Sequence, residues 1–296
     1  MPYNRRSFFR TVSASVAAAL PAMPQSQRFR NPLGAELYTV RARFPKHADA
    51  TLKRIEDIGY SEVEAGRGEL AMLGPILRKY DLAVPSVHIE TGLLTGNRQE
   101  WKLPAGVTFE GAVDEATSHG AKFVVIPYVR PDERRTPDEW RAFCDKMNQA
   151  GEVARKAGVS LCYHNHAFEF AGQPGERLID ILLERTDPAL VGLEVDVFWV
   201  SAAGLDPAEF LHRHTARVRL LHLKDKSKNA PVIFDESKVK PSEFKEVGNG
   251  SLDFAAILRA ADKAGAAHYF VEQDHTPGDP VKSLQVSYQH LRALTI

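Results

Sequence analysis

Residues 156–164 read Lys156-Ala157-Gly158-Val159-Ser160-Leu161-Cys162-Tyr163-His164, which puts a glycine at the expected end of a helix and an apolar, strand-like run directly after it. Glycine in this position adopts a left-handed conformation that closes the last carbonyls of the helix. The same pattern recurs at Gly59, Gly120 and Gly265. The chain is therefore predicted to repeat a unit in which a helix passes through a short loop into a strand.

Eight apolar runs have the length and composition of strands, and they lie at 36–41, 60–65, 84–90, 122–129, 159–164, 191–198, 217–224 and 268–273. Strands that alternate with helices form a parallel sheet with crossover helices. Eight units spaced about 33 residues apart predict a single-domain (β/α)₈ TIM barrel over residues 30–296. A doubly wound open sheet is the competing fold, but no glycine-rich phosphate fingerprint follows the first run. The long connection at 225–250 is expected to shape the mouth of the active site.

The first 25 residues have the pattern of an export signal with its linker. Arg5 and Arg6 lie in a basic stretch, and an alanine-rich, mildly apolar segment follows. The arginine pair followed by Ser7-Phe8-Phe9 resembles the twin-arginine signal, which the twin-arginine export machinery reads. We therefore expect a periplasmic or secreted protein that carries no membrane anchor. A basic N-terminus without a targeting role is the alternative.

Composition excludes several classes of protein. The chain has 296 residues, of which 44% are hydrophobic and 26% charged, as is usual for a soluble globular domain. Lys and Arg number 38 and so do Asp and Glu, so no basic surplus points to nucleic acid. Cys144 and Cys162 could pair in an oxidising compartment, but we interpret them as buried apolar side chains. The sequence leaves a homo-oligomer open.

Carboxylates and imidazoles gather where the predicted strands end. The carboxyl ends of parallel barrel strands meet on one face, where active sites form. This face would collect Glu64, His88, Glu90, His164, His166, Glu169, Glu194, Asp196, His222, Lys224, Asp225, Glu272 and Asp274. Carboxylates combined with imidazole suit Mn²⁺, Co²⁺, Fe²⁺, Mg²⁺ or Zn²⁺. We predict one bound divalent metal ion, with Mn²⁺ as the first choice.

Five stretches near these strand ends carry a resemblance to a known family. They read Tyr163-His164-Asn165-His166-Ala167-Phe168-Glu169-Phe170, Leu193-Glu194-Val195-Asp196-Val197-Phe198-Trp199, Leu221-His222-Leu223-Lys224-Asp225, Val247-Gly248-Asn249-Gly250 and Phe270-Val271-Glu272-Gln273-Asp274. In these stretches the chain resembles the xylose-isomerase-like barrel superfamily of sugar isomerases and epimerases, with its sugar phosphate isomerase/epimerase family. The resemblance covers essentially the whole chain after the signal.

The resemblance implies four metal ligands, which are Glu169, Asp196, His222 and Glu272. Members of the superfamily include ketose 3-epimerases and inosose dehydratase. The ketose 3-epimerases carry a substrate-contacting histidine three residues after the ligand aspartate, whereas this chain has Trp199 there. That difference argues against a free ketohexose. The ring of Trp199 would suit a sugar ring or an aglycone, or it packs in the core.

Two carboxylates beside a cation suggest a mechanism. Removal of a proton next to a carbonyl creates an enediolate, which a divalent ion stabilises as a Lewis acid. Glu169 and Glu272 are the predicted catalytic base and acid. Return of the proton to the other face gives an epimerase, return to the next carbon an isomerase, and loss of a β-substituent a lyase. Candidate substrate contacts are His88, His164, His166, Trp199 and Lys224, and each of the polar ones could instead support a metal ligand.

The sequence thus predicts a metal-dependent isomerase or epimerase that acts on a keto-sugar or keto-glycoside. A keto-sugar lyase or dehydratase on the same site is the first alternative. A non-catalytic, exported carbohydrate-binding protein is the second. An apurinic-site endonuclease is disfavoured, because residues 1–22 hold three arginines and no acid, and their removal leaves 35 cations against 38 anions.

Overall fold

Eight parallel strands close into a barrel, as the sequence predicts. The computed structural model describes residues 28–296, so the predicted export signal lies outside the described residues. The barrel strands are β1 (Gly34–Glu36), β2 (Glu62–Gly66), β3 (Ala83–His88), β4 (Phe123–Ile126), β5 (Ser160–His164), β6 (Val191–Asp196), β7 (Val218–Leu223) and β10 (His268–Val271). Each strand pairs with the next in the chain around the ring, and β1 closes it against β10. The fold is a single-domain (β/α)₈ barrel.

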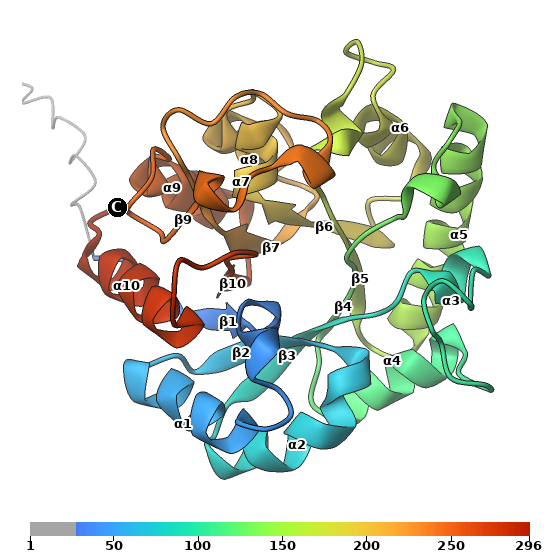
Figure 1. Ribbon diagram of the computed structural model, residues 1–296. Helices are drawn as coiled ribbons and strands as arrows, with labels where there is room; N and C mark the ends of the chain where they lie inside the picture. Colours follow the sequence, from blue (N-terminus) through green and yellow to red (C-terminus); the bar gives the residue numbers. More distant parts are fainter. Residues whose placement is uncertain (1–27) are drawn as a thin grey trace, which may run out of the picture.

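A ring of helices surrounds the strands, as Figure 1 shows in a view along the barrel. Its members are α1 (Ala48–Ile58), α2 (Leu70–Lys79), α4 (Phe109–Ser118), α5 (Pro137–Lys156), α6 (Leu178–Arg185), α8 (Pro207–Arg213), α9 (Phe254–Ala264) and α10 (Pro280–Ala293). Two shorter helices, α3 (Gly92–Thr95) and α7 (Val197–Ala202), lie after β3 and β6. None of the helices within residues 28–296 is long and apolar enough to cross a membrane.

Local signals in the sequence account for the boundaries of several helices. Gly59 and Gly265 follow α1 and α9 with φ angles of 112° and 77°, so they provide the left-handed caps expected of them. The hydroxyl of Thr136 accepts a hydrogen bond from the Glu139 amide and starts α5 with a capping box. Both cysteines are free and buried, Cys144 in α5 and Cys162 in β5.

Several predicted strands end earlier in the structure, and two of them pass directly into a helix. The run at 36–41 is strand only as far as Glu36, after which the chain forms the 3₁₀ helix η1 (Leu37–Arg43). The run at 191–198 ends at Asp196, because the carboxylate of Asp196 accepts hydrogen bonds from the amides of Phe198 and Trp199. That bonding starts α7 and turns the chain out of the sheet. Apolar composition alone could not show either turn.

The long connection after β7 is folded rather than extended. It contains β8 (Asp225–Lys226) and β9 (Phe244–Lys245), which pair antiparallel, and the 3₁₀ helices η5 (Glu236–Lys238) and η6 (Pro241–Glu243). The remaining 3₁₀ helices are η2 (Arg67–Glu69), η3 (Pro131–Glu133) and η4 (Phe168–Phe170). The buried carboxylate of Asp225 accepts hydrogen bonds from the amides of Gly248, Gly250, Ser251 and Leu252. Asp225 therefore anchors this connection, and its side chain is directed toward the loop.

Candidate active site and metal centre

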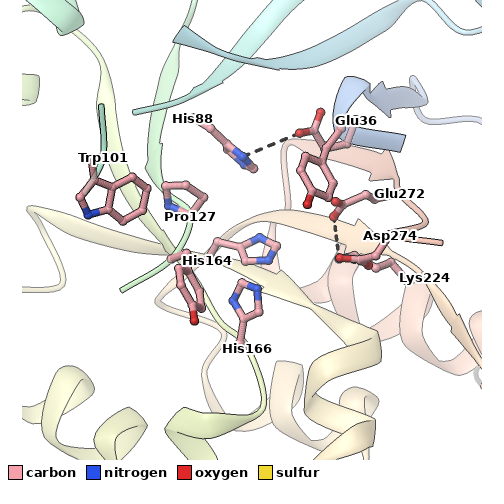
Figure 2. Close-up of a pocket in the computed structure, with 11 residues that line it drawn as sticks. Glu36, His88, Trp101, Pro127, His164, His166, Lys224, Glu272 and Asp274 are labelled. Carbon is pink, nitrogen blue, oxygen red and sulfur yellow. Dashed lines mark hydrogen bonds and ion pairs between the residues drawn. The ribbon is translucent and has the colours of Figure 1, made fainter. Parts of the chain in front are cut away.

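A cavity of about 430 Å³ opens at the carboxyl ends of the strands. Its lining residues are Glu36, Tyr38, His88, Trp101, Pro127, Tyr128, His164, His166, Lys224, Glu272 and Asp274. Figure 2 shows the imidazoles of His88, His164 and His166 across this space from Glu272, Asp274 and Lys224. Five residues predicted from the sequence as site residues thus line one cavity: His88, His164, His166, Lys224 and Glu272.

A buried ammonium group sits among three carboxylates on one side of the cavity. Nζ of Lys224 lies 2.7 Å from Oε2 of Glu272 and 2.9 Å from Oδ2 of both Asp196 and Asp274. Burial would lower the pKa of Lys224, but these carboxylates outweigh burial and raise that pKa. Lys224 is therefore charged at neutral pH, and this part of the site attracts cations.

Three of the four ligands implied by the resemblance lie together. Asp196, His222 and Glu272 each offer one ligand atom, and these atoms are all within 4.8 Å of one another. Nδ1 of His222 is 2.8 Å from Oε2 of Glu272. Oδ2 of Asp196 is buried and lies 2.9 Å from Nζ of Lys224. Carboxylate oxygens and one imidazole nitrogen are suitable ligands for a divalent ion, so the residues present fit the predicted metal.

Glu169, the fourth implied ligand, lies apart from that group. Its side chain is fully buried after β5, where Oε1 accepts a hydrogen bond from the Tyr163 hydroxyl at 2.6 Å and Oε2 accepts one from the His166 amide at 2.9 Å. Within the described residues, the candidate metal-binding groups do not include Glu169. Burial raises the pKa of Glu169 to about 7, against which these hydrogen bonds act. Its role as a ligand stays a prediction.

Two of the three carboxylates next to the lysine have different proton affinities. Burial raises the pKa of Asp196 to about 6, despite the charge of Lys224. Burial also opposes ionisation of Glu272, but there Lys224 and His222 outweigh it and lower the pKa of Glu272. Glu272 is thus the readily ionised member of the pair. Such a separation of neighbouring carboxylates is typical of acid–base sites.

The two histidines of the motif at 163–170 are neutral. Burial and the charge of Lys224 lower the pKa of His166, and burial with the neighbouring imidazoles lowers that of His164. Nε2 of His164 is 3.6 Å from Oδ2 of Asp196, which places His164 at the edge of the metal group. Neutral imidazoles can donate or accept a hydrogen bond, and both rings face the cavity.

Trp199 lies behind the side of the cavity that His166 lines. Its ring is 3% exposed and stacks on His166 with the centroids 5.1 Å apart. It also packs edge-on against Phe244 of β9 at 5.9 Å. The structure therefore places Trp199 as support for His166, while its predicted contact with substrate stays untested.

Five residues of the cavity wall were not identified from the sequence. Glu36 ends β1, and the first run was predicted to continue to residue 41, which hid this carboxylate. Tyr38, Trp101, Pro127 and Tyr128 lie outside the strands of the structure, although all of these except Trp101 fall within runs predicted as strands. Tyr128 donates a 2.6 Å hydrogen bond to Glu236 in the long connection at 225–250. That connection thus contacts the cavity wall, as expected.

Curated relatives of the chain are named as inosose dehydratases. The chain is 27% identical over 272 residues to an inosose dehydratase from Geobacillus kaustophilus, a match that covers 83% of this chain and 87% of the relative. It is 32% identical over 167 residues to an inosose dehydratase from Geobacillus thermodenitrificans, which covers 53% of this chain and 55% of the relative. Only part of the chain is involved in this second match.

Solved structures share the fold at lower identity. A sugar phosphate isomerase/epimerase from Parabacteroides distasonis superposes with a TM-score of 0.70 at 21% identity, covering 95% of this chain and 98% of its own. The 3-keto-D-glucoside 4-epimerase YcjR from E. coli has a TM-score of 0.63 at 16% identity, and the match covers 90% of this chain and 100% of the epimerase. IOLI protein with a binding zinc atom has a TM-score of 0.65 at 15% identity, and the match covers 87% of this chain and 95% of that protein. A Mycobacterium smegmatis protein in complex with magnesium also has a TM-score of 0.65 at 15% identity, and the match covers 88% of this chain and 95% of that protein.

A family model spans most of the barrel. The model of the xylose isomerase-like TIM barrel matches residues 52–294, from α1 to the end of α10. This range contains the metal group and the motifs at the ends of β5, β6, β7 and β10. The chain belongs to the xylose isomerase-like TIM barrel family.

Proposed function

We propose that the protein is a divalent-metal-dependent enzyme that acts on a keto-sugar or keto-glycoside by removing a proton next to the carbonyl. The observation that carries this proposal is the group of Asp196, His222 and Glu272 beside a cavity with a buried lysine and two neutral histidines. Relatives named as inosose dehydratase and a structural neighbour named as a 3-keto-D-glucoside epimerase support this class of substrate.

Asp196, His222 and Glu272 are proposed to hold the metal, with Glu169 as a further ligand by family resemblance. A divalent ion bound there would act as a Lewis acid toward the carbonyl and hydroxyl oxygens of the substrate. Mn²⁺ remains the first choice, and the zinc and magnesium seen with structural neighbours are the alternatives. The ammonium of Lys224 would donate hydrogen bonds to a negatively charged oxygen of the substrate.

Proton transfer is assigned to Glu169 and Glu272. Glu272 lines the cavity, and its lowered pKa keeps it ionised, so it holds no proton before the reaction. A pKa of about 7 for Glu169 suits a group that exchanges a proton at neutral pH. His166 contacts Glu169 through its amide, while its ring lines the cavity.

The cavity favours a substrate without phosphate and with an attached group. Its volume of about 430 Å³ lies within the usual range for small-molecule sites. Tyr38, Trp101 and Tyr128 give it an aromatic wall, which suits the apolar face of a sugar ring or an aglycone. The amides of Gly248 and Gly250 bond the carboxylate of Asp225, so this glycine motif is already engaged and offers no nest to a phosphate.

A lyase outcome is the second candidate, since the curated relatives are dehydratases. Both outcomes begin with removal of the same proton. They differ in whether the carbanion is protonated again or expels a β-hydroxyl or glycosidic oxygen, with the electron pair leaving on that oxygen.

The test uses solvent exchange because it detects the shared first step. Protein loaded with Mn²⁺ is incubated in deuterated water with 3-keto-glycosides and keto-cyclitols, and the products are read by NMR. For an epimerase we expect deuterium at the carbon next to the carbonyl, together with an inverted centre. For a lyase we expect loss of the hydrogen from that carbon and an enone product. Binding of these sugars with neither exchange nor product under any of the metals would favour the non-catalytic carbohydrate-binding alternative.

A further inference from the structure

A layer of ionisable side chains lies in the barrel interior next to the proposed metal group. Glu64 on β2, Glu194 on β6 and His222 on β7 are fully buried, and His88 on β3 is 15% exposed at its side chain. Barrel interiors are ordinarily filled by branched apolar side chains. Buried carboxylates are costly unless a cation or hydrogen-bond donors compensate them.

Four atoms of this layer form a closed ring of short contacts. Nε2 of His88 is 3.1 Å from Oε2 of Glu64 and 3.1 Å from Oε2 of Glu194. Nε2 of His222 is 2.5 Å and 3.2 Å from the same two oxygens. Ligands placed about 2.0–2.2 Å from a tetrahedral ion stand about 3.4 Å apart, so each of these four contacts is within about 1 Å of the spacing of neighbouring ligands around an ion.

The hydrogen atoms on the two Nε2 atoms are too few to make a hydrogen bond at each of these four contacts. Each Nε2 atom carries at most one hydrogen, yet each faces two carboxylate oxygens. At most two imidazole hydrogens therefore serve these four contacts, and Nδ1 of His164 also lies 2.9 Å from Oε2 of Glu194. In addition, the Oε1 atoms of Glu64 and Glu194 are buried and have no hydrogen-bond partner among residues 28–296. An ion at the centre would bond all four ring atoms and neutralise both carboxylates.

A carboxylate that only holds the imidazole of a metal ligand in place would explain half of this arrangement. An imidazole that binds metal through Nδ1 commonly donates its Nε2 hydrogen to a carboxylate. One such carboxylate would serve His222, but the structure provides two. It also provides His88, whose Nε2 faces the same oxygens and whose Nδ1 is 3.8 Å from Glu36.

We infer that His88, His222, Glu64 and Glu194 form a second divalent-cation site, deeper in the barrel than the group of Asp196, His222 and Glu272. Two imidazoles and two carboxylates suit Zn²⁺, Mn²⁺ or Fe²⁺. His222 faces the deep site with Nε2 and Glu272 with Nδ1, so it would bridge the two sites as an imidazolate, with its ring proton released to solvent when both ions bind. The inference concerns metal binding alone and does not depend on the proposed reaction.

The test measures how many ions the full chain binds. Metal-free protein is equilibrated with manganese chloride, separated from free metal by gel filtration, and analysed for manganese per chain. We expect about two ions for the parent, about one for His88→Gln and about one for Glu272→Ala. Glu62→Gln is the matched control, because Glu62 lies two residues before Glu64 on β2 and makes a single 2.9 Å contact with His268. It should keep both ions.

The outcomes separate this inference from the proposed function. One ion in the parent, retained by His88→Gln and lost by Glu272→Ala, would overturn the deep site and leave the proposed active-site metal intact. One ion that is lost by His88→Gln and retained by Glu272→Ala would support the deep site and remove the proposed active-site metal.

A second measurement needs no variant to fold. Two Mn²⁺ ions that share one imidazole interact magnetically, whereas a single ion gives an isolated hyperfine pattern. The electron paramagnetic resonance spectrum of the fully loaded parent should therefore show a spin-coupled pair. A spectrum of isolated ions at full loading would contradict the bridged arrangement.

Discussion

Lys224 places its ammonium nitrogen 2.7 Å from Oε2 of Glu272, so a protein cation occupies part of the space in which a divalent ion is proposed to bind. The same nitrogen is 2.9 Å from Oδ2 of Asp196. Lys224 and the metal therefore compete for two of the same carboxylates. The lysine keeps these carboxylates compensated when the metal is absent, and it must yield or share them when metal binds.

Replacing Lys224 by methionine tests this competition. Lys224→Met keeps the length of the side chain and removes the charge that compensates three buried carboxylates. We expect metal-free Lys224→Met to melt at lower temperature than the parent, and Mn²⁺ to raise its melting temperature by more than it raises that of the parent. Thermal unfolding with and without metal measures both shifts. An equal metal-induced shift in the two proteins would show that the lysine does not compete.

The anchor of the long connection is a second target. The buried carboxylate of Asp225 accepts five backbone hydrogen bonds, so Asp225→Asn leaves amide donors unpaired and sets its own NH₂ group against them. A loss of about 3 kcal/mol in unfolding free energy is expected from denaturant titration. Asp235→Asn is the control, because Asp235 caps an exposed turn of the same connection. It should cost under about 1 kcal/mol.

Export can be tested independently of the barrel. Arg5 and Arg6 form the twin-arginine pair predicted from the sequence. A receptor that reads guanidinium groups should reject lysine although the charge is unchanged, so the double variant Arg5→Lys, Arg6→Lys should accumulate in the cytoplasm. Cell fractionation and immunoblotting report the location. The purified barrels of parent and variant should unfold alike, and normal export of the variant would contradict the twin-arginine interpretation.

The barrel could be predicted from the sequence because its signals are local. Glycine caps such as Gly59 and Gly265 are set by backbone conformation, and they mark the helix-to-strand loops directly. Asp196, His222, Lys224 and Glu272 were found because strand ends converge on one face in any parallel barrel. The position of Glu36 was missed because its strand ends in a 3₁₀ helix, which apolar composition does not reveal.

Side-chain direction explains the remaining differences between sequence and structure. Asp225 and Lys224 are neighbours in the chain, but Lys224 faces the cavity and Asp225 faces its loop. Trp199 packs behind His166. Glu169 bonds Tyr163 and an amide, which no spacing rule could anticipate. These outcomes depend on tertiary contacts, whereas the strand-end list depends only on topology.

The raised pKa of Glu169 predicts a pH dependence of stability in metal-free protein. The pKa is about 7 in the folded state against an ordinary value of 4.5, so the folded state binds more protons between these values. Stability from this group is therefore highest below pH 4.5 and falls as the pH rises to 7. Glu169→Gln cannot ionise, so the pH dependence of its melting temperature should lack this contribution. Tyr163→Phe removes a hydrogen bond that favours the carboxylate, so it should shift the fall to higher pH.

Glutamine variants of Glu169 and Glu272 distinguish proton transfer from metal binding. Glutamine keeps an oxygen that can face a cation but cannot accept the proton, so each variant should keep part of its metal and lose turnover by about 10²-fold or more. Glu272 lines the cavity, whereas Glu169 reaches it only through His166. A single-base lyase would then lose solvent exchange in Glu272→Gln and keep it in Glu169→Gln, while a two-base epimerase would lose inversion in both. Both variants are assayed for bound manganese, for deuterium exchange and for product. Parent-like turnover in both, with metal retained, would remove both residues from the catalytic assignment.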